Sequence, residues 1–194
     1  MPAMTDSSES VVNGMSASQR SSHWANSGLV TEIRVEDFVH LESEYGPLAG
    51  LMYQQQLEHL AREMGGDKQI APAQRIMDFV KGKESKLLPP TSYLPGVISS
   101  RLDEWLPKII GDALRGGIAT FDRRMRGYMT NEGIVVGVES RTSTPVRIPR
   151  DKDTLMHPEV VGLYPAGEGA GYAGGIISAA LDGERIADAI NHNH

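Results

Sequence analysis

The sequence predicts an α+β fold: a small mixed sheet, a helical insertion, and a C-terminal strand, glycine-rich loop and helix. Short β-rich apolar segments occur near the start of the chain and again after Gly133. Between them, across roughly 47–126, apolar residues recur at helical spacing. A loop with five glycines between Gly167 and Gly175 then separates an apolar run from a final helical pattern. With 194 residues, of which 40% are hydrophobic, the chain is long enough for one domain or one and a half.

The first part of the chain predicts a polar tail followed by strands. Residues 1–10 bury too little apolar area to offset the entropy of ordering and are expected to be disordered. Val11-Val12 is expected to end a short strand at the turn dipeptide Asn13-Gly14. The hydroxyl-rich stretch 16–22 is either a solvated connector or a loop that faces a ligand. The alternation over 29–35 predicts a half-buried strand.

The middle of the chain predicts helices. Pro47 suits a first helical turn, and apolar residues at helical spacing continue until Gly65-Gly66 ends the helix. Residues 69–75 are expected to be extended, with a brief helix through Phe79, and prolines keep 87–96 irregular.

A further helix is expected to begin at Ser99 or Ser100, with Pro107 dividing it or bending it. A second short helix is expected to carry Phe121 and Met125. Three arginines on it form either a solvated face or a site for a nicotinamide phosphate: Arg123, Arg124 and Arg126.

The last third of the chain predicts strands and then a helix. Strands are expected at 134–139 and 146–148, and a buried strand at 160–164. A helix over 176–190 is expected to pack through small residues at steps of four and three, namely Ile176, Ala180, Gly183, Ala187 and Ile190.

The glycine loop contains Gly169-Ala-Gly171-Tyr-Ala-Gly174, which fits the G-x-G-x-x-G dinucleotide fingerprint. That motif requires a second parallel strand after the helix and an acidic residue about 20 residues further on. The sequence supplies neither, so a first Rossmann βαβ unit is not expected here. The loop and helix are instead expected to close over a ligand that is bound mainly by another part of a protein.

Four segments resemble a family of uncharacterised FAD-dependent dehydrogenases. The strongest are 163–175, which resembles the family's C-terminal flavin-contacting segment, and 141–148. Ala71-Pro-Ala-Gln-Arg75 and Tyr93-Leu-Pro-Gly96 also fit, so the resemblance begins near residue 9. Members of that family are longer and carry an N-terminal FAD-binding βαβ half, so the resemblance implies a C-terminal fragment of a two-domain flavoprotein or the product of a truncated gene.

The resemblance implies FAD as cofactor, with NAD(P) as a possible second one. It implies a substrate-side domain over 11–133 and a C-terminal part over 134–194 that contacts the flavin. By analogy with two-domain flavoproteins, Glu168 accepts a hydrogen bond from a ribityl hydroxyl, and backbone N–H groups near Tyr172 to Gly174 face the flavin ring. The implied cofactor-binding residues are Gly167, Glu168, Gly169, Ala170, Gly171, Tyr172, Ala173, Gly174 and Gly175.

Arg141, Thr142 and Ser143 either cap a turn or line a pocket for an unidentified small-molecule substrate. An arginine there is able to clamp a carboxylate through two hydrogen bonds. No general acid or base is identified.

Composition narrows the class of protein. A net charge of −6 and a pI near 5.5 argue against a nucleic-acid partner, and no apolar run approaches the roughly 18 residues of a membrane helix. The first residues lack the pattern of a secretory signal, so a cytoplasmic location is expected. The chain has no cysteine, and its histidines lack metal-ligand spacing, so no metal site is expected.

Two functions remain. The chain is either the C-terminal portion of an FAD-dependent oxidoreductase or a stand-alone interaction module that binds no flavin. Because the diphosphate of FAD would be held by the absent βαβ half, the isolated chain is expected to be colourless and to bind FAD weakly or not at all. Apolar surface that would face that half is expected to be exposed and to favour a homodimer.

Overall fold

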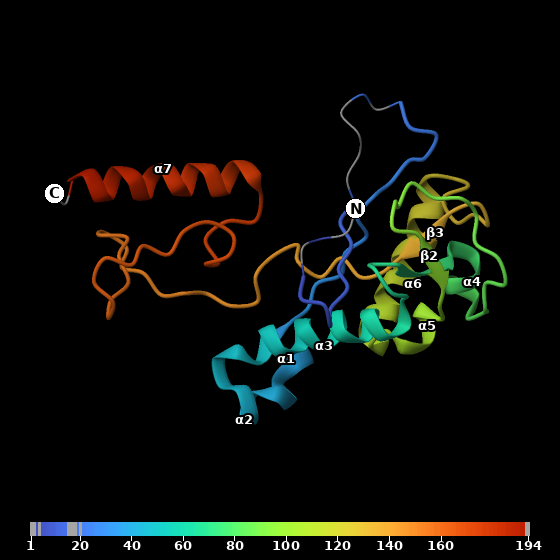
Figure 1. Cartoon of the computed structure of the whole chain (residues 1–194), viewed down its shortest axis with the longest axis horizontal. Coiled ribbons are helices and arrows are strands. Elements are labelled where there is room, and N and C mark those ends of the chain that lie inside the picture. The colour runs from blue at the N-terminus through green and yellow to red at the C-terminus, as the bar shows by residue number, and fades with distance from the viewer. Residues whose placement is uncertain (1–2, 4, 15–18, 20, 193–194) are drawn as a thin grey trace. The chain divides into compact units, whose positions relative to one another are not determined.

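The computed structural model describes residues 3, 5–14, 19 and 21–192, and only the backbone of His192 (Figure 1). Parts of the predicted tail (1–2 and 4), most of the hydroxyl-rich stretch (15–18 and 20) and 193–194 lie outside the described residues. The helices are α1 (Val35–Phe38), η1 (Val39–Leu41), α2 (Glu42–Tyr45), η2 (Gly46–Leu48), α3 (Ala49–Met64), α4 (Ile76–Lys81), α5 (Leu102–Trp105), α6 (Lys108–Arg124) and α7 (Ile176–His192). The strands are β1 (Ala71–Arg75), β2 (Val97–Ser99) and β3 (Ile134–Val136).

The three strands form one mixed sheet in the order β2-β1-β3, which confirms the predicted α+β fold. β1 runs parallel to β2, with Ala71 opposite Val97, and antiparallel to β3, with Ala73 opposite Val136. The central strand is buried along most of its length, as expected for a strand with neighbours on both sides.

The chain divides into two compact units. The first contains Met1–Arg34 and Gln55–Ser140, and the second contains Val35–Gln54 and Arg141–His194. β3 therefore belongs to the first unit.

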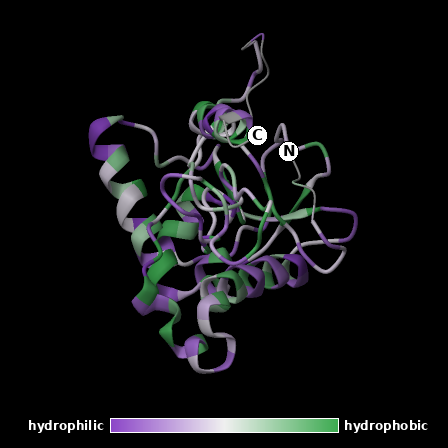
Figure 2. Ribbon diagram, turned by 90° about the vertical axis from the view of Figure 1, so that its left-hand side faces the viewer, coloured by the Kyte–Doolittle hydropathy of each residue, from purple (hydrophilic) through white to green (hydrophobic). Residues whose placement is uncertain are grey.

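The main core of the first unit lies where α4, α5 and α6 pack together. Its fully buried residues are Phe79, Leu102, Leu106 and Ile118, and half-buried residues such as Trp105 and Tyr128 surround them. Each large apolar side chain removed from water in this way stabilises the fold by about 1.5–3 kcal/mol. Green and purple alternate along the helical ribbons of Figure 2, as is typical of amphipathic helices.

The helix boundaries follow the predicted proline and glycine positions. Pro47 lies in the 3-10 turn before α3, and α3 ends at Met64, just before Gly65. A Cβ atom at Gly65 would lie 2.6 Å from the carbonyl oxygen of Ile70, so only glycine fits at this turn. Pro107 separates α5 from α6, which confirms that two helices meet there. The separate short helix around Phe121 was wrong, because α6 continues through this residue to Arg124.

Several predicted strands are absent. Residues 29–34, 146–148 and 160–164 form no strand, and α1 begins at Val35. The 160–164 run is a turn, in which the Leu163 N–H donates to the Val160 carbonyl. A strand needs a continuous row of partner groups, and among the described residues the 146–148 segment has a single backbone bond, from the Ile148 N–H to the Ala170 carbonyl. A run of apolar residues predicts that a segment can be buried in a sheet, but it does not provide the neighbouring strand to which the backbone must bond.

The described end of the predicted tail packs against the first unit. Glu9 and Ser10 are buried, and the Ser10 N–H donates to the Glu58 carbonyl. Val12 forms a bridge through its N–H to the Val138 carbonyl, so the short strand expected at Val11-Val12 is a single pairing. None of the described helices combines the length and the hydrophobicity needed to cross a membrane.

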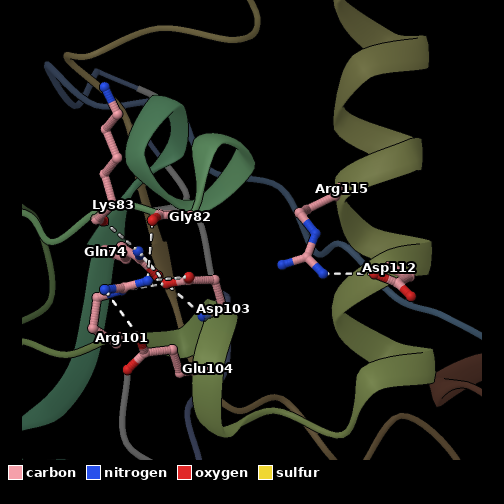
Figure 3. Close-up of polar contacts among 8 residues, drawn as sticks. All are labelled: Gln74, Gly82, Lys83, Arg101, Asp103, Glu104, Asp112 and Arg115. Atoms are coloured by element: carbon pink, nitrogen blue, oxygen red, sulfur yellow. Dashed lines mark hydrogen bonds and ion pairs between the residues drawn. The ribbon is translucent and has the colours of Figure 1, made fainter.

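A buried polar network joins β1 to the loops after α4 and to the start of α5 (Figure 3). The Gln74 side chain is fully buried; its Nε2 donates to the Lys83 carbonyl at 2.8 Å and to Asp103 Oδ1 at 2.5 Å. Its Oε1 accepts from the Asp103 N–H at 3.2 Å, and Arg101 pairs with the same carboxylate at 2.7 Å. Burial opposes ionisation of Asp103, but the hydrogen bonds from Arg101 and Gln74 hold its pKa below the usual value.

Replacing Gln74 with leucine should therefore destabilise the protein by about 2–3 kcal/mol, because the Lys83 carbonyl and the Asp103 N–H would lose their buried partner. Urea unfolding of Gln74→Leu measures the change. Gln56→Leu, at an exposed position on α3, is the matched control and should shift stability by no more than about 0.5 kcal/mol. Equal effects of the two substitutions would show that the network contributes nothing.

Candidate cofactor loop

The glycine loop of the second unit is fixed by a buried ion pair between Arg150 and Asp182. The Arg150 side chain is 6% exposed and the Asp182 side chain 7%. Arg150 Nη1 donates to Asp182 Oδ2 at 2.9 Å and Nη2 donates to Oδ1 at 2.6 Å, a two-point pairing that fixes direction as well as distance. Nη1 also donates to the Pro165 carbonyl at 2.9 Å.

The same carboxylate holds the start of the loop. The Gly167 N–H donates to Asp182 Oδ2 at 2.9 Å, so one side chain of α7 joins the loop to the segment that carries Arg150. The hydrogen bonds from Arg150, followed by the one from Gly167, lower the pKa of Asp182 despite its burial. The pairing also raises the pKa of Arg150.

Tyr172 is fixed at both its backbone and its ring. Its N–H donates to the Gly167 carbonyl, and its hydroxyl donates to the Ile148 carbonyl at 3.0 Å. The guanidinium carbon of Arg150 lies 3.6 Å from the ring centroid, and that of Arg147 lies 4.3 Å away. The resemblance implies that the Tyr172 N–H faces the flavin ring. In the structure this N–H is already bonded within the loop, to the Gly167 carbonyl.

Two glycines of the loop are required by the chain's own fold. Gly171 has a φ of +84°, and a Cβ atom there would lie 2.9 Å from the Val146 carbonyl oxygen. Gly167 has a φ of +64°, also a conformation that favours glycine. These two positions need no ligand to explain them.

Gly169 and Gly174 are different. Neither has a positive φ, and a Cβ atom at either position would meet no other atom within 4 Å. Nothing in the described chain therefore requires glycine at these sites. Open backbone of this kind allows another molecule to approach closely, which fits a flavin lying against the loop.

The groups beside this open backbone are available for binding. The Ala173 and Gly174 N–H groups, and the Glu168 carboxylate, have no hydrogen-bond partner among the described residues. They precede α7, a helix of 17 residues whose first N–H groups carry a partial positive charge. Ile176 and Ile177 at this end are 88% and 72% exposed. The loop therefore presents two donors and one acceptor that no described residue occupies, beside two exposed apolar side chains.

The contact face predicted for α7 was wrong. Ile176, Ala180, Gly183 and Ala187 are exposed, whereas Asp182 and Ile186 are buried. The reason is the Arg150–Asp182 pair: a paired charge is buried, and the helix is rotated so that this side chain, not the small residues, faces inward.

The other predicted residues lie on exposed segments. Arg141, Thr142 and Ser143 are exposed, and so are Arg123, Arg124 and Arg126 around the end of α6. Ala170 is buried, with its carbonyl bonded to the Ile148 N–H, so its role is structural. The sequence reasoning did not single out Arg150 or Asp182, which lie 32 positions apart with no local motif linking them.

Breaking the ion pair should make stability less dependent on pH. The pKa of Asp182 in the folded protein lies below the ordinary value of 3.8. The ionised carboxylate therefore contributes its full share to the free energy of unfolding above pH 3.8, and this share is lost as the pH falls through the folded pKa. Asp182→Asn should cost about 3 kcal/mol at pH 7, since Arg150 would remain buried without its partner, and should lose less stability than the native protein below pH 4. Urea unfolding between pH 7 and pH 2.5 tests this, with Glu184→Gln at an exposed position of α7 as control.

The two classes of loop glycine should respond differently to alanine. Gly171→Ala should destabilise the protein by about 1–3 kcal/mol, because the new Cβ atom meets the Val146 carbonyl and the positive φ becomes strained. Gly169→Ala should change stability by less than about 0.5 kcal/mol. Thermal unfolding of both variants is the measurement; a large loss with Gly169→Ala would mean that this residue, too, serves the fold.

Comparison with known proteins places the chain in a family. Residues 1–142 match the family described as FAD-dependent protein, C-terminal domain-like. An uncharacterized protein of Clostridium beijerinckii is 42% identical over 190 residues, which cover 97% of this chain and 35% of that protein. The chain thus spans about a third of the length of this relative, and the matched family region ends before the glycine loop. With a match over most of its length, the chain belongs to the family FAD-dependent protein, C-terminal domain-like.

Proposed function

We propose that the chain is the C-terminal portion of an FAD-dependent oxidoreductase, in which residues 167–175 contact the flavin end of the cofactor. The observation that carries this proposal is the open backbone at Gly169 and Gly174, which the fold of the chain does not explain. Membership of a family described as FAD-dependent supports the choice of cofactor. NAD(P) as a second cofactor has no comparable support.

The loop residues take distinct roles in this proposal. The Glu168 carboxylate accepts a hydrogen bond from a ribityl hydroxyl, and the N–H groups of Ala173 and Gly174 donate to the ring. Gly167, Ala170 and Gly171 shape the loop, and Tyr172 anchors it through its ring and hydroxyl. Arg150 and Asp182 hold the whole arrangement without touching the cofactor.

FAD, when bound, supplies the hydride chemistry of an oxidoreductase. The chain's contribution is orientation and electrostatics. The positive end of α7 favours negative charge placed near it by about 0.3–1 kcal/mol, and by about 2 kcal/mol where it is partly buried. That preference would favour the reduced, anionic state of a group held there.

The remaining roles concern substrate and partner. Arg141, with Thr142 and Ser143, is proposed to bind a small-molecule substrate, because a guanidinium together with two hydroxyls suits a carboxylate and all three residues are exposed. The exposed Ile176 and Ile177 are proposed to face the FAD-binding part of a longer flavoprotein, or a second copy of this chain. The net charge of −6 argues against a nucleic-acid partner.

The loop assignment is testable by NMR with FAD. We expect weak, saturable binding by the 194-residue protein, with the largest amide shift changes at Ala173, Gly174 and Ile176, because the diphosphate lacks the helix end that would normally hold it. Gly174→Val should weaken binding by about tenfold, since its side chain would fill the open space in front of the backbone.

Gly183→Val is the matched control, because Gly183 also has no atom within 4 Å of a Cβ position but lies in the interior of α7 and not in the loop. It should leave the FAD affinity unchanged. Absence of shift changes in the loop at saturating FAD, or equal weakening by both variants, would contradict the assignment and favour the alternative of an interaction module that binds no flavin.

A further inference from the structure

The second unit contains a cleft of about 830 Å³ formed by residues 147–155, by Tyr172 of the glycine loop and by α7. This volume lies within the range of about 300–1,000 Å³ that is typical of small-molecule sites. Its charged lining residues are Arg147, Arg150, Asp151, Lys152, Asp182 and Arg185; Pro149, Leu155 and Tyr172 supply apolar surface.

The charge of this cleft is opposite to that of the chain. Four cationic side chains and two carboxylates line it, which leaves a surplus of two positive charges in a protein whose net charge is −6. A local surplus of this sign attracts anions even when the whole molecule is acidic.

The two carboxylates are already committed to the fold. Asp182 is bonded to Arg150 and to the Gly167 N–H. Asp151 accepts hydrogen bonds from the Thr154 N–H at 2.8 Å, the Asp153 N–H at 3.0 Å and the Thr154 hydroxyl at 3.0 Å, which close a turn. Asp182 therefore uses both of its oxygens within the fold, and Asp151 uses Oδ1.

Three of the cations, by contrast, are available. Arg147, Lys152 and Arg185 form no ion pair with any described residue. Arg147 lies over the Tyr172 ring, a contact that orients the guanidinium and leaves its charge in place. The buried Arg150–Asp182 pair and the Tyr172 hydroxyl bond form a fixed base, so these cations surround a surface that is already ordered.

We propose that this cleft binds the diphosphate group of a small molecule. Guanidinium groups match the oxygens of phosphate in pairs, and a lysine adds a point charge, so three unpaired cations suit a group with several negative charges. The volume exceeds that of a single ion, and the apolar surface of Pro149, Leu155 and Tyr172 accommodates an organic portion. The site stands independently of the flavin assignment, since its three available cations lie outside the loop 167–175.

Calorimetric titration of the full chain with pyrophosphate at 50 mM salt tests the proposal. We expect saturable binding of one ligand per chain that weakens as salt is raised. The double substitution Lys152→Gln/Arg185→Gln should lower the affinity at least about tenfold, because it removes two of the three available cations. Both side chains belong to exposed residues, so the variant should remain folded, as circular dichroism would verify.

The matched control is Lys81→Gln/Lys86→Gln, which removes the same charge from two exposed residues of the first unit. It should change the affinity less than twofold. A parallel titration with ADP identifies the source of the group: tighter binding of ADP assigns a nucleotide, and equal affinities assign the diphosphate alone. Absence of saturable binding of either ligand, or an equal loss in the control, would overturn the proposal. The flavin assignment would be unaffected, because its readout is the amide shift of the loop.

Discussion

The second unit depends on the ion pair between Arg150 and Asp182. One guanidinium and one carboxylate, both almost fully buried, join α7, the start of the glycine loop and the segment before the Asp151 turn. The cost of removing both charges from water offsets much of their attraction, so a buried pair of this kind adds little net stability. Its main effect is to fix how the loop, α7 and the segment carrying Arg150 are arranged. Removing either member would leave the other charge without compensation, so the geometry of the loop and of the cleft follows from both.

The first unit is fixed by similar means. Gln74 is fully buried in the central strand, and its amide joins the loop after α4 to the start of α5 through the Lys83 carbonyl and Asp103. Gln74 belongs to the short motif Ala71–Arg75 that resembles the flavoprotein family, yet its contacts are within the protein. The motif is explained by folding, whereas the open glycines of the second unit are not, and this contrast is why the cofactor proposal rests on Gly169 and Gly174.

Glycine alone is therefore a poor indicator of a ligand. Among the loop glycines, Gly167 and Gly171 adopt positive φ values and serve the backbone, whereas Gly169 and Gly174 face open space. The sequence shows all of them as one cluster. Only the tertiary structure separates the glycines that shape the loop from those that leave room for another molecule.

The sequence by itself determined the α+β class, the proline and glycine boundaries of α3, α5 and α6, and the final helix, because these follow from local periodicity and backbone restriction. The tertiary structure decided which β-rich segments pair. β1 pairs with β2 and β3, whereas 146–148 and 160–164 form no strand. It also decided which face of α7 is buried. The small residues predicted a close packing surface, but the partner of Asp182 lies 32 positions earlier, and no local pattern encodes a contact over that distance.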